Sequence, residues 1–197
     1  MQHALVWHFP EPMMCIASAP HGGGVGLRSW VCNAQVPRDF PYTDLDEHVL
    51  DIAHAHGCRG EGVGMLTAAR VADASYACED GIDVCATVGV TLPTWAAASN
   101  GASTAWQAGT VNIFVRVPTR LTPAALVNTV MTATEAKSQA LLEASVPGTG
   151  TASDAVCVVC PASGEAAEFG GPRSGVGAPL ARSVHRAIRE GLQRCSR

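Results

Sequence analysis

The stretch TPAALVNTVMTATEAKSQALLEAS, residues 122–145, has the apolar spacing and the end signals of one long helix. Thr122 is a good N-cap, Pro123 suits the first helical position, and Gly148 lies just beyond the far end. Such an amphipathic helix needs an apolar surface to cover. Short runs rich in valine, isoleucine and cysteine elsewhere in the chain supply that surface.

These runs predict strands, and the remaining periodic segments predict helices. The strands are expected at residues 4–9, 13–18, 30–36, 63–67, 83–90, 111–117 and 155–160. The helices are expected at residues 44–57, 122–145 and 178–195, with a shorter one near 68–77. Because strands and helices do not alternate strictly, they favour an α+β (mixed α/β) fold. We expect a single domain over residues 1–197, with a mixed sheet of about seven strands packed by three main helices.

Composition excludes several classes of partner. A formal net charge of −4 and a pI near 5.9 give no electrostatic footprint for nucleic acid. No apolar run approaches the roughly 18–20 residues that span a bilayer, and residues 1–10 lack the features of a signal peptide. We therefore expect a cytoplasmic protein with no nucleic-acid or membrane partner. Its eight cysteines are then expected to be reduced thiols.

No pattern in the sequence predicts a metal site. Cys157 and Cys160 form a CxxC, but alternate faces of a strand point them apart, and no second pair completes a zinc site. His48, His54 and His56 share one short helix, with spacings that do not gather their nitrogens. His48 alone is kept as a candidate for substrate contact.

Lys137 is the only lysine, against twelve arginines, and it falls at the centre of the apolar stripe of the long helix. A lysine there must reach out to water or be held by a partner, and it is a candidate for acid, base or electrostatic work. Chance is the alternative in so arginine-rich a chain. Glu135 lies on the opposite, polar stripe, so at most one of the two residues is expected in a site.

Three glycine-rich polar segments could surround a ligand at strand ends. They are SAPHGGGVG (18–26), GTVN (109–112) and GTGTASD (148–154). The first lacks the pattern of a phosphate loop, but Gly22, Gly23 and Gly24 allow close approach of the backbone to a large flat ligand. Asp154 is either a turn-capping carboxylate or a catalytic one.

Seven motifs, taken in order, resemble a known family over roughly residues 14–190. They are SAPHGGG (18–24), NAQVPRDF (33–40), VGMLTAA (63–69), ATVGV (86–90), GTVNI (109–113), ALVNTVMTATEAKSQAL (125–141) and GTASDAV (150–156). No one of them is specific, but the ordered set resembles the adenosylcobinamide amidohydrolase (CbiZ-type) family. The alanine- and serine-rich loop 95–108 departs most from the family pattern, which puts ligand contacts there in doubt.

The resemblance implies corrinoid salvage. The family hydrolyses the amide between the aminopropanol arm and the corrin ring of adenosylcobinamide, releasing adenosylcobyric acid for coenzyme B12 synthesis. It implies a cobalt corrinoid as substrate, no required cofactor and a possible homo-oligomer. The expected substrate contacts are Gly22, Gly23, Gly24, Asn33, Thr67, Asn112, Thr151 and His48. A corrinoid carrier in which His21 or another histidine touches cobalt, and an amidase for another small amide, are the competing functions.

Chemistry leaves several mechanisms open. Amide hydrolysis needs a nucleophile, donors to the developing oxyanion and an acid for the leaving amine. In the first mechanism a carboxylate, Glu135 or Asp154, activates water, and Lys137 protonates the amine or stabilises charge. Asn112 and N–H groups of the loops would then form the oxyanion site.

The second mechanism is covalent. Thr110, Thr151 or Ser153 attacks, with Lys137 as general base. A self-processing version cuts the chain before Thr110 to expose a threonine amine, and an intact mass below 20.3 kDa would reveal it. Metal-assisted hydrolysis is the third route.

Overall fold

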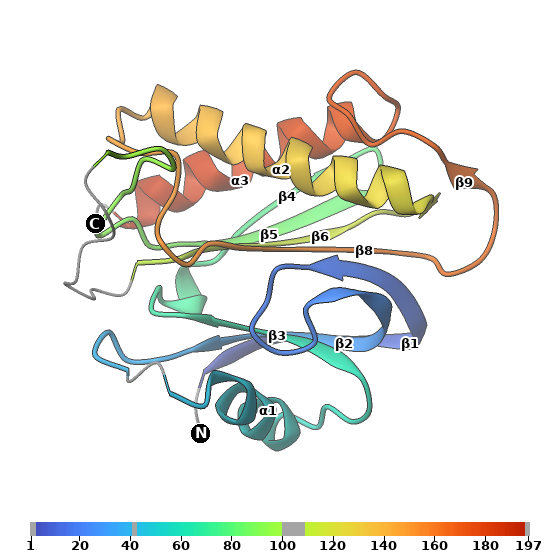
Figure 1. Ribbon diagram of the computed structural model, residues 1–197, viewed down its shortest axis with the longest axis horizontal. Helices are drawn as coiled ribbons and strands as arrows, with labels where there is room; N and C mark the ends of the chain where they lie inside the picture. Colours follow the sequence, from blue (N-terminus) through green and yellow to red (C-terminus); the bar gives the residue numbers. More distant parts are fainter. Residues whose placement is uncertain (1–2, 41–42, 100–108, 196–197) are drawn as a thin grey trace.

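The computed structural model describes residues 3–40, 43–99 and 109–195 (Figure 1). Its strands are β1 (Ala4–Ala17), β2 (Gly24–Gln35), β3 (Gly62–Thr67), β4 (Ser75–Glu79), β5 (Ile82–Val88), β6 (Val111–Arg116), β7 (Arg120–Leu121), β8 (Ala155–Cys160) and β9 (Ala166–Ala167). Its helices are α1 (Leu45–Ala55), α2 (Pro123–Glu143) and α3 (Gly177–Cys195), with a 3₁₀ turn η1 (Val71–Asp73).

Seven strands form one mixed sheet in the order β3-β2-β1-β8-β6-β5-β4, and β7 pairs with β9 separately. The pairs β2–β3 and β6–β8 are parallel, and the other pairs of the large sheet are antiparallel. β1 joins the two halves, because its residues Met14–Ala17 pair with β2 on one side and with β8 on the other. The expected α+β domain with a seven-stranded mixed sheet and three main helices is confirmed.

The sheet folds back on itself, so the molecule has four layers (Figure 1). Helices α2 and α3 cover strands β4, β5, β6 and β8, which lie over β1, β2 and β3, and α1 covers the far side. Three apolar clusters fill the spaces between these layers. The middle cluster, between the two halves of the sheet, contains Val31 and Met65 from one half and Phe114 and Cys157 from the other.

The burial of β8 explains why its sequence is a continuous apolar run. All six of its residues are buried, because both faces of the strand are covered. Cys160 belongs to the cluster under the helices, whereas Cys157 belongs to the middle cluster, where its Sγ lies 3.6 Å from Sγ of Cys15. The prediction that Cys157 and Cys160 point to opposite faces is therefore confirmed.

The ends of α2 follow from local chemistry. Thr122 is the N-cap, and its hydroxyl accepts a hydrogen bond from the Ala125 N–H at 3.2 Å. The helix ends at Glu143, earlier than expected, and Ser145 then takes a positive φ of 60°. Thr132 is buried and donates a hydrogen bond to the Gly170 carbonyl at 2.8 Å.

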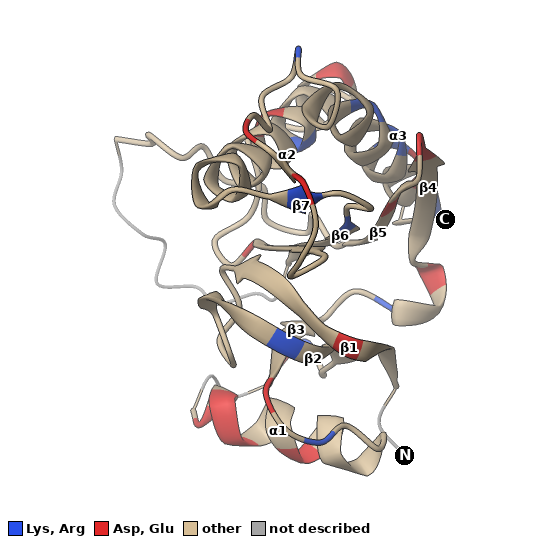
Figure 2. Cartoon of the chain, turned by 90° about the vertical axis from the view of Figure 1, so that its right-hand side faces the viewer, with Lys and Arg blue, Asp and Glu red and all other residues tan. Residues whose placement is uncertain are grey.

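α1 is an amphipathic outer layer. Its buried residues Val49, Ile52 and Ala53 pack against the sheet. Acidic residues gather along its outer side, as Figure 2 shows. Among the described residues, no helix combines the length and apolar character that a membrane crossing requires.

Two expectations about secondary structure were wrong. Residues 4–9 and 13–18 were expected as two strands, but they form the single strand β1, with a register shift between His8 and Met13. Residues 68–77 were expected as a short helix, but they hold η1 and the start of β4. β4 turns into β5 through Asp80 and Gly81, whose positive φ values of 51° and 78° suit a tight hairpin.

Candidate active site

A cavity of about 350 Å³ lies where several strands of the two halves of the sheet begin or end. The residues in its wall come from the end of β3 and the segments after β1, β2 and β3, from the start of α1, and from the starts of β6 and β8. They are Ser18, Ala19, Pro20, Val36, Phe40, Leu45, Leu66, Thr67, Ala68, Thr110, Asn112, Ser153, Asp154 and Ala155. The wall is mostly apolar, and a few polar side chains converge in it, as is typical of small-molecule sites.

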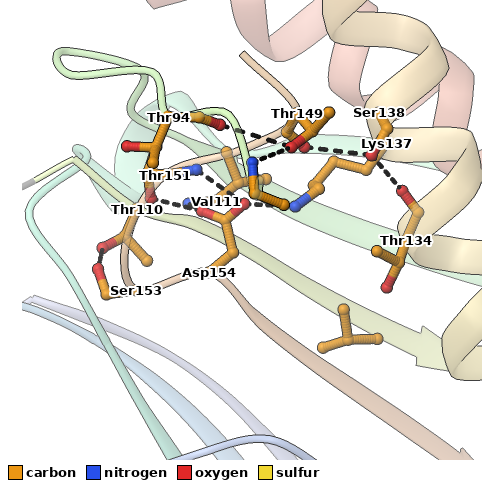
Figure 3. A network of polar contacts seen from close by, with 12 residues as sticks. Thr94, Thr110, Val111, Thr134, Lys137, Ser138, Thr149, Thr151, Ser153 and Asp154 are labelled. Atoms are coloured by element: carbon orange, nitrogen blue, oxygen red, sulfur yellow. Dashed lines mark hydrogen bonds and ion pairs between the residues drawn. The ribbon is translucent and has the colours of Figure 1, made fainter. Parts of the chain in front are cut away.

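Lys137 and Asp154 form an ion pair beside this cavity (Figure 3). Lys137 Nζ lies 2.5 Å from Asp154 Oδ2, and the two side chains are only 8% and 11% exposed. The expectation that Lys137 is either solvated or held by a partner is resolved, since α2 presents it inward to a carboxylate. A buried pair of this kind requires further hydrogen bonds to offset the loss of hydration.

Asp154 receives those further bonds from two neighbouring segments. Its Oδ1 accepts from the Val111 N–H at 2.9 Å and from the Thr151 hydroxyl at 2.5 Å, and its Oδ2 accepts from the Thr151 N–H at 3.1 Å. With Lys137, four donors therefore occupy the roughly four acceptor positions of the carboxylate. None is left for a water to be activated, so the geometry favours Asp154 as a positioning residue rather than as a general base.

Gly150 lets the loop lie directly on this ion pair. A Cβ at Gly150 would overlap both Asp154 Oδ2 and Lys137 Nζ. The same loop is held from the other side, because the Thr94 N–H donates to the Gly150 carbonyl at 2.8 Å and the Thr149 N–H donates to the Thr94 carbonyl at 3.0 Å. The remainder of the alanine-rich loop, at residues 100–108, lies outside the described residues.

Two hydroxyls meet in the cavity wall. Thr110 Oγ1 lies 2.7 Å from Ser153 Oγ, so one hydroxyl donates to the other. Thr110 is 4% exposed and begins the approach to β6, while Ser153 precedes Asp154 at the approach to β8. The hydrogen bond of Lys137 goes to Asp154, so Lys137 is not placed as a direct base for either hydroxyl.

Asn112 presents an acceptor where a donor was expected. Its Nδ2 donates to Asn33 Oδ1 and to the Leu66 carbonyl, both at 2.9 Å, and Asn33 Nδ2 donates in turn to Thr87 Oγ1 at 3.0 Å. Because the carbonyl can only accept, it fixes which way the Asn112 amide points. Asn112 Oδ1 is buried and has no partner among the described residues. The expectation that Asn112 donates to an oxyanion is therefore not supported by its geometry.

The structure brings some of the other candidate residues to the cavity and not others. Thr67 lines it, and the Thr67 hydroxyl accepts from the Ala69 N–H at 3.1 Å. Asn33 lies behind Asn112, and Thr151 lies behind Asp154. Glu135 is exposed and lines a different cavity, between α2 and α3, so the structure does not place it with Lys137.

Gly22, Gly23 and Gly24 lie outside the lining of the cavity, although Ser18, Ala19 and Pro20 of the same segment line it. Gly22 has a positive φ of 62°, and a Cβ there would overlap the carbonyl of Gly62. A Cβ at Gly23 would come 2.5 Å from the Ala19 carbonyl oxygen, whereas the position of Gly24 is open. Gly22 and Gly23 therefore allow close packing of chain on chain, and the expected backbone contact with a flat ligand has no support here.

The candidate histidines contact aromatic rings. His48 packs on Phe40, with ring centroids 4.4 Å apart, and so supports a residue of the cavity wall. His21 stacks on Trp30, and its Nδ1 lies 2.8 Å from Asp46 Oδ1. In the part of the chain that the structure describes, no group of three or more His, Cys, Asp or Glu side chains is placed to hold a metal.

Sequence reasoning missed Ser18 and Phe40 as parts of the wall. Two hydrogen bonds join Ser18 to β8. The Ser18 N–H donates to the Val156 carbonyl at 3.0 Å, and the Ser18 hydroxyl accepts from the Val156 N–H at 3.1 Å. The available signal was a small polar residue directly after a strand whose last residues alternate between buried and half-buried. Phe40 gave no signal of its own beyond its place in the NAQVPRDF motif.

Comparison with known proteins assigns this chain to a family. A family model described as adenosylcobinamide amidohydrolase matches residues 1–197. An adenosylcobinamide amidohydrolase of Methanosarcina mazei is 31% identical over 180 residues, which cover 87% of this chain and 86% of the relative. One of Halobacterium salinarum is 34% identical over 164 residues, which cover 80% and 71%. The solved PH0078 protein of Pyrococcus horikoshii OT3 gives a TM-score of 0.38 at 11% identity over 94% of this chain and 72% of its own, which is too low to establish a shared fold.

Proposed function

This chain belongs to the adenosylcobinamide amidohydrolase family, and we propose that it hydrolyses the amide between the aminopropanol arm and the corrin ring of adenosylcobinamide. The products are adenosylcobyric acid and the free amine of the arm, which makes the reaction a step of coenzyme B12 salvage. The observation that carries a mechanism for this chain is the pair of hydroxyls, Thr110 and Ser153, 2.7 Å apart in the cavity wall.

Thr110 is the nucleophile in this proposal. Its Oγ1 attacks the amide carbon, the C–N bond breaks, and an ester forms between the corrin carboxyl and Thr110. The proton of the Thr110 hydroxyl passes through Ser153 Oγ to the leaving nitrogen, which departs as an amine. Water then hydrolyses the ester, releasing the carboxylate and restoring the Thr110 hydroxyl.

Two other side chains complement the substrate amide. The Thr67 hydroxyl already accepts from a backbone N–H, so its proton is free to donate to the carbonyl oxygen as charge develops there. Asn112 Oδ1 has no partner within the described parts of the chain, and an amide N–H can supply one. A donor and an acceptor in one wall suit the C=O and N–H groups of a secondary amide.

Lys137 and Asp154 act through position. The carboxylate binds the Val111 N–H next to Thr110 and lies next to Ser153 in the chain, so the ion pair holds both hydroxyl-bearing segments against α2. Misplacement by about 1 Å of groups that must meet in the transition state can cost about 100-fold in rate. A positioning role therefore still makes the pair essential for turnover.

The test is incubation of the protein with adenosylcobinamide, with the products separated by chromatography. Adenosylcobyric acid is the expected product. Binding of the corrinoid without product would favour a carrier, in which His21 or another histidine touches cobalt. Cleavage of simple amides at comparable kcat/KM would favour a general amidase instead.

We further propose that the protein works in the cytoplasm on a free corrinoid, with the cobalt arriving as part of the substrate and no resident cofactor. The acidic pI near 5.9 supports the absence of a nucleic-acid partner. Turnover that survives dialysis against a chelator would agree with this proposal, and loss restored by one divalent metal would contradict it. Sedimentation analysis tests whether the chain forms a homo-oligomer.

A further inference from the structure

A second cavity, of about 430 Å³, adjoins the first one. The two cavities share Val36 and Ala68 in their walls, so they lie next to each other at this point. The polar lining of the second cavity is dominated by Arg38, Arg70 and Arg194, and Asp73 is the only acidic residue among the described residues of its wall. Three of the twelve arginines of an acidic chain thus surround one hollow next to the proposed catalytic hydroxyls.

The charges of these arginines are only partly neutralised. Arg70 Nε lies 3.5 Å from Asp73 Oδ2, with the Arg70 side chain 73% exposed. Arg194 donates a hydrogen bond to the Ala74 carbonyl, which fixes its guanidinium, and its ion-pair partner, Glu190, is 3.9 Å away. Arg38 is exposed, and no partner for it is found in the described part of the chain. The positive charge of the three arginines is therefore not fully neutralised, which favours the binding of an anion.

A neutral donor of the same wall also suits an anion. Gln35 Oε1 accepts from the Val71 N–H at 3.1 Å, which orients its amide and leaves its NH₂ group as a donor. Guanidinium groups bind phosphate through paired, charge-assisted hydrogen bonds. A phosphate is therefore a better chemical match for this lining than a neutral amide or an apolar group.

We propose that this arginine-lined cavity binds a phosphate carried by the aminopropanol arm, so that the preferred substrate is a corrinoid with a phosphorylated arm. The proposal rests on the proposed function, and it names the substrate of that same site. Four covalent bonds separate the amide nitrogen from a phosphorus on the arm hydroxyl, a reach of about 5 Å. In this proposal the amide lies at Thr110 and Ser153, and the arm points to the wall that the two cavities share, at Val36 and Ala68.

The experiment compares kcat/KM for adenosylcobinamide, adenosylcobinamide phosphate and a complete cobamide, whose arm carries a phosphodiester. The wild type is expected to prefer one of the phosphorylated compounds by about tenfold or more. Arg38→Ala and Arg70→Ala are each expected to remove most of that preference and to change the value for adenosylcobinamide less than about twofold. Arg173→Ala, an exposed arginine outside this lining, is the matched control and is expected to change neither value.

Binding of the same compounds, measured by calorimetry, separates this proposal from the proposed function. Tenfold tighter binding of a phosphorylated compound that depends on Arg38 supports the cavity even if no amide is cleaved, and then only the hydrolase function fails. Cleavage of all three compounds at equal kcat/KM, unchanged by Arg38→Ala and Arg70→Ala, would overturn the proposal and leave the hydrolase intact. Inhibition of the wild type by inorganic phosphate without any preference among the three would also overturn it, since the cavity would then bind a free anion. A preference for the diester or the monoester identifies which form the arm carries.

Discussion

Lys137 on α2 and Asp154 just before β8 form a buried ion pair at 2.5 Å, and the carboxylate also binds the N–H next to Thr110. Through this one carboxylate, the helix layer is tied to two strands that begin at the proposed site (Figure 3). The only lysine of the chain therefore has a defined structural task, which is to hold Thr110 and Ser153 in register.

Replacement of Lys137 by methionine should be costly for stability. Asp154 would stay buried without its cation, and breaking a buried pair in this way costs about 3–5 kcal/mol. Urea unfolding measures this loss, and hydrolysis by Lys137→Met or Lys137→Ala should fall at least about 100-fold because the hydroxyls lose their register. Arg182→Met, which removes the exposed pair with Glu79, is the matched control and should leave the urea midpoint nearly unchanged.

The ion pair is also expected to behave as a coupled unit. Asp154→Asn alone should destabilise, and combined with Lys137→Met it should cost clearly less than the sum of the two single changes. Strict additivity of the free energies of unfolding, or full activity of Lys137→Ala, would show that the pair has no such role.

Gly150→Ala should reproduce much of this damage without touching a charge. The added Cβ would overlap the ends of both side chains of the ion pair, so either these side chains or the loop has to shift. We expect a loss of turnover together with a lower melting temperature. Gly171→Ala, where the new Cβ meets nothing within 4 Å, is the control. Equal turnover and equal melting temperatures of the two variants would show that the site accommodates the added Cβ without loss.

Glu135→Ala should leave hydrolysis within about twofold of the wild type, because Glu135 is exposed on another side of α2 and lines a separate cavity. The same assay that follows Lys137→Ala measures it. A loss of activity comparable to that of Lys137→Ala would return Glu135 to the list of catalytic groups and argue for the water mechanism.

Much of the fold followed from periodicity and end signals. The N-cap Thr122 and Pro123 located the start of α2, and continuous apolar runs located β6 and β8. β1 was divided in two because Pro10 and Pro12 interrupt its pattern, and the register shift lies in that same stretch. β4 was missed although Asp80-Gly81 is a strong hairpin signal, because its short alternating run was taken for part of a helix.

Less of the site than of the fold could be predicted from the sequence. Lys137 and Asp154 were both named as candidate residues, and they lie 17 residues apart, but their direct ion pair was not predicted. The contacts that set the direction of the Asn112 amide join residues 79 and 46 positions away, and no local pattern encodes them. The glycines were expected to contact a ligand, whereas Gly22 and Gly23 face neighbouring backbone. A sequence cannot show which group approaches a glycine in the folded chain.

Thiol labelling tests the burial of the core independently of any corrinoid. Cys78 and Cys195 are exposed and the other six cysteines are buried. Burial raises the pKa of the Cys32 thiol to about 12 and that of Cys85 to about 11, so neither supplies the reactive thiolate near neutral pH. A hydrogen bond with Asp83 raises the pKa of Cys78, so Cys195 should react first and Cys78 second. Rapid labelling of three or more thiols in the native protein would contradict the described packing.

The account depends most on Thr110 as the attacking group. Thr110→Ser keeps a hydroxyl at this position, whereas Thr110→Val keeps the shape and removes the nucleophile. With each protein first shown to have its full intact mass of 20.3 kDa, which sets aside self-cleavage, the direct measurement is the rate of adenosylcobyric acid formation from adenosylcobinamide. The account predicts that Thr110→Ser retains turnover and that Thr110→Val loses at least about 1,000-fold. Turnover by Thr110→Val at the wild-type rate would contradict it.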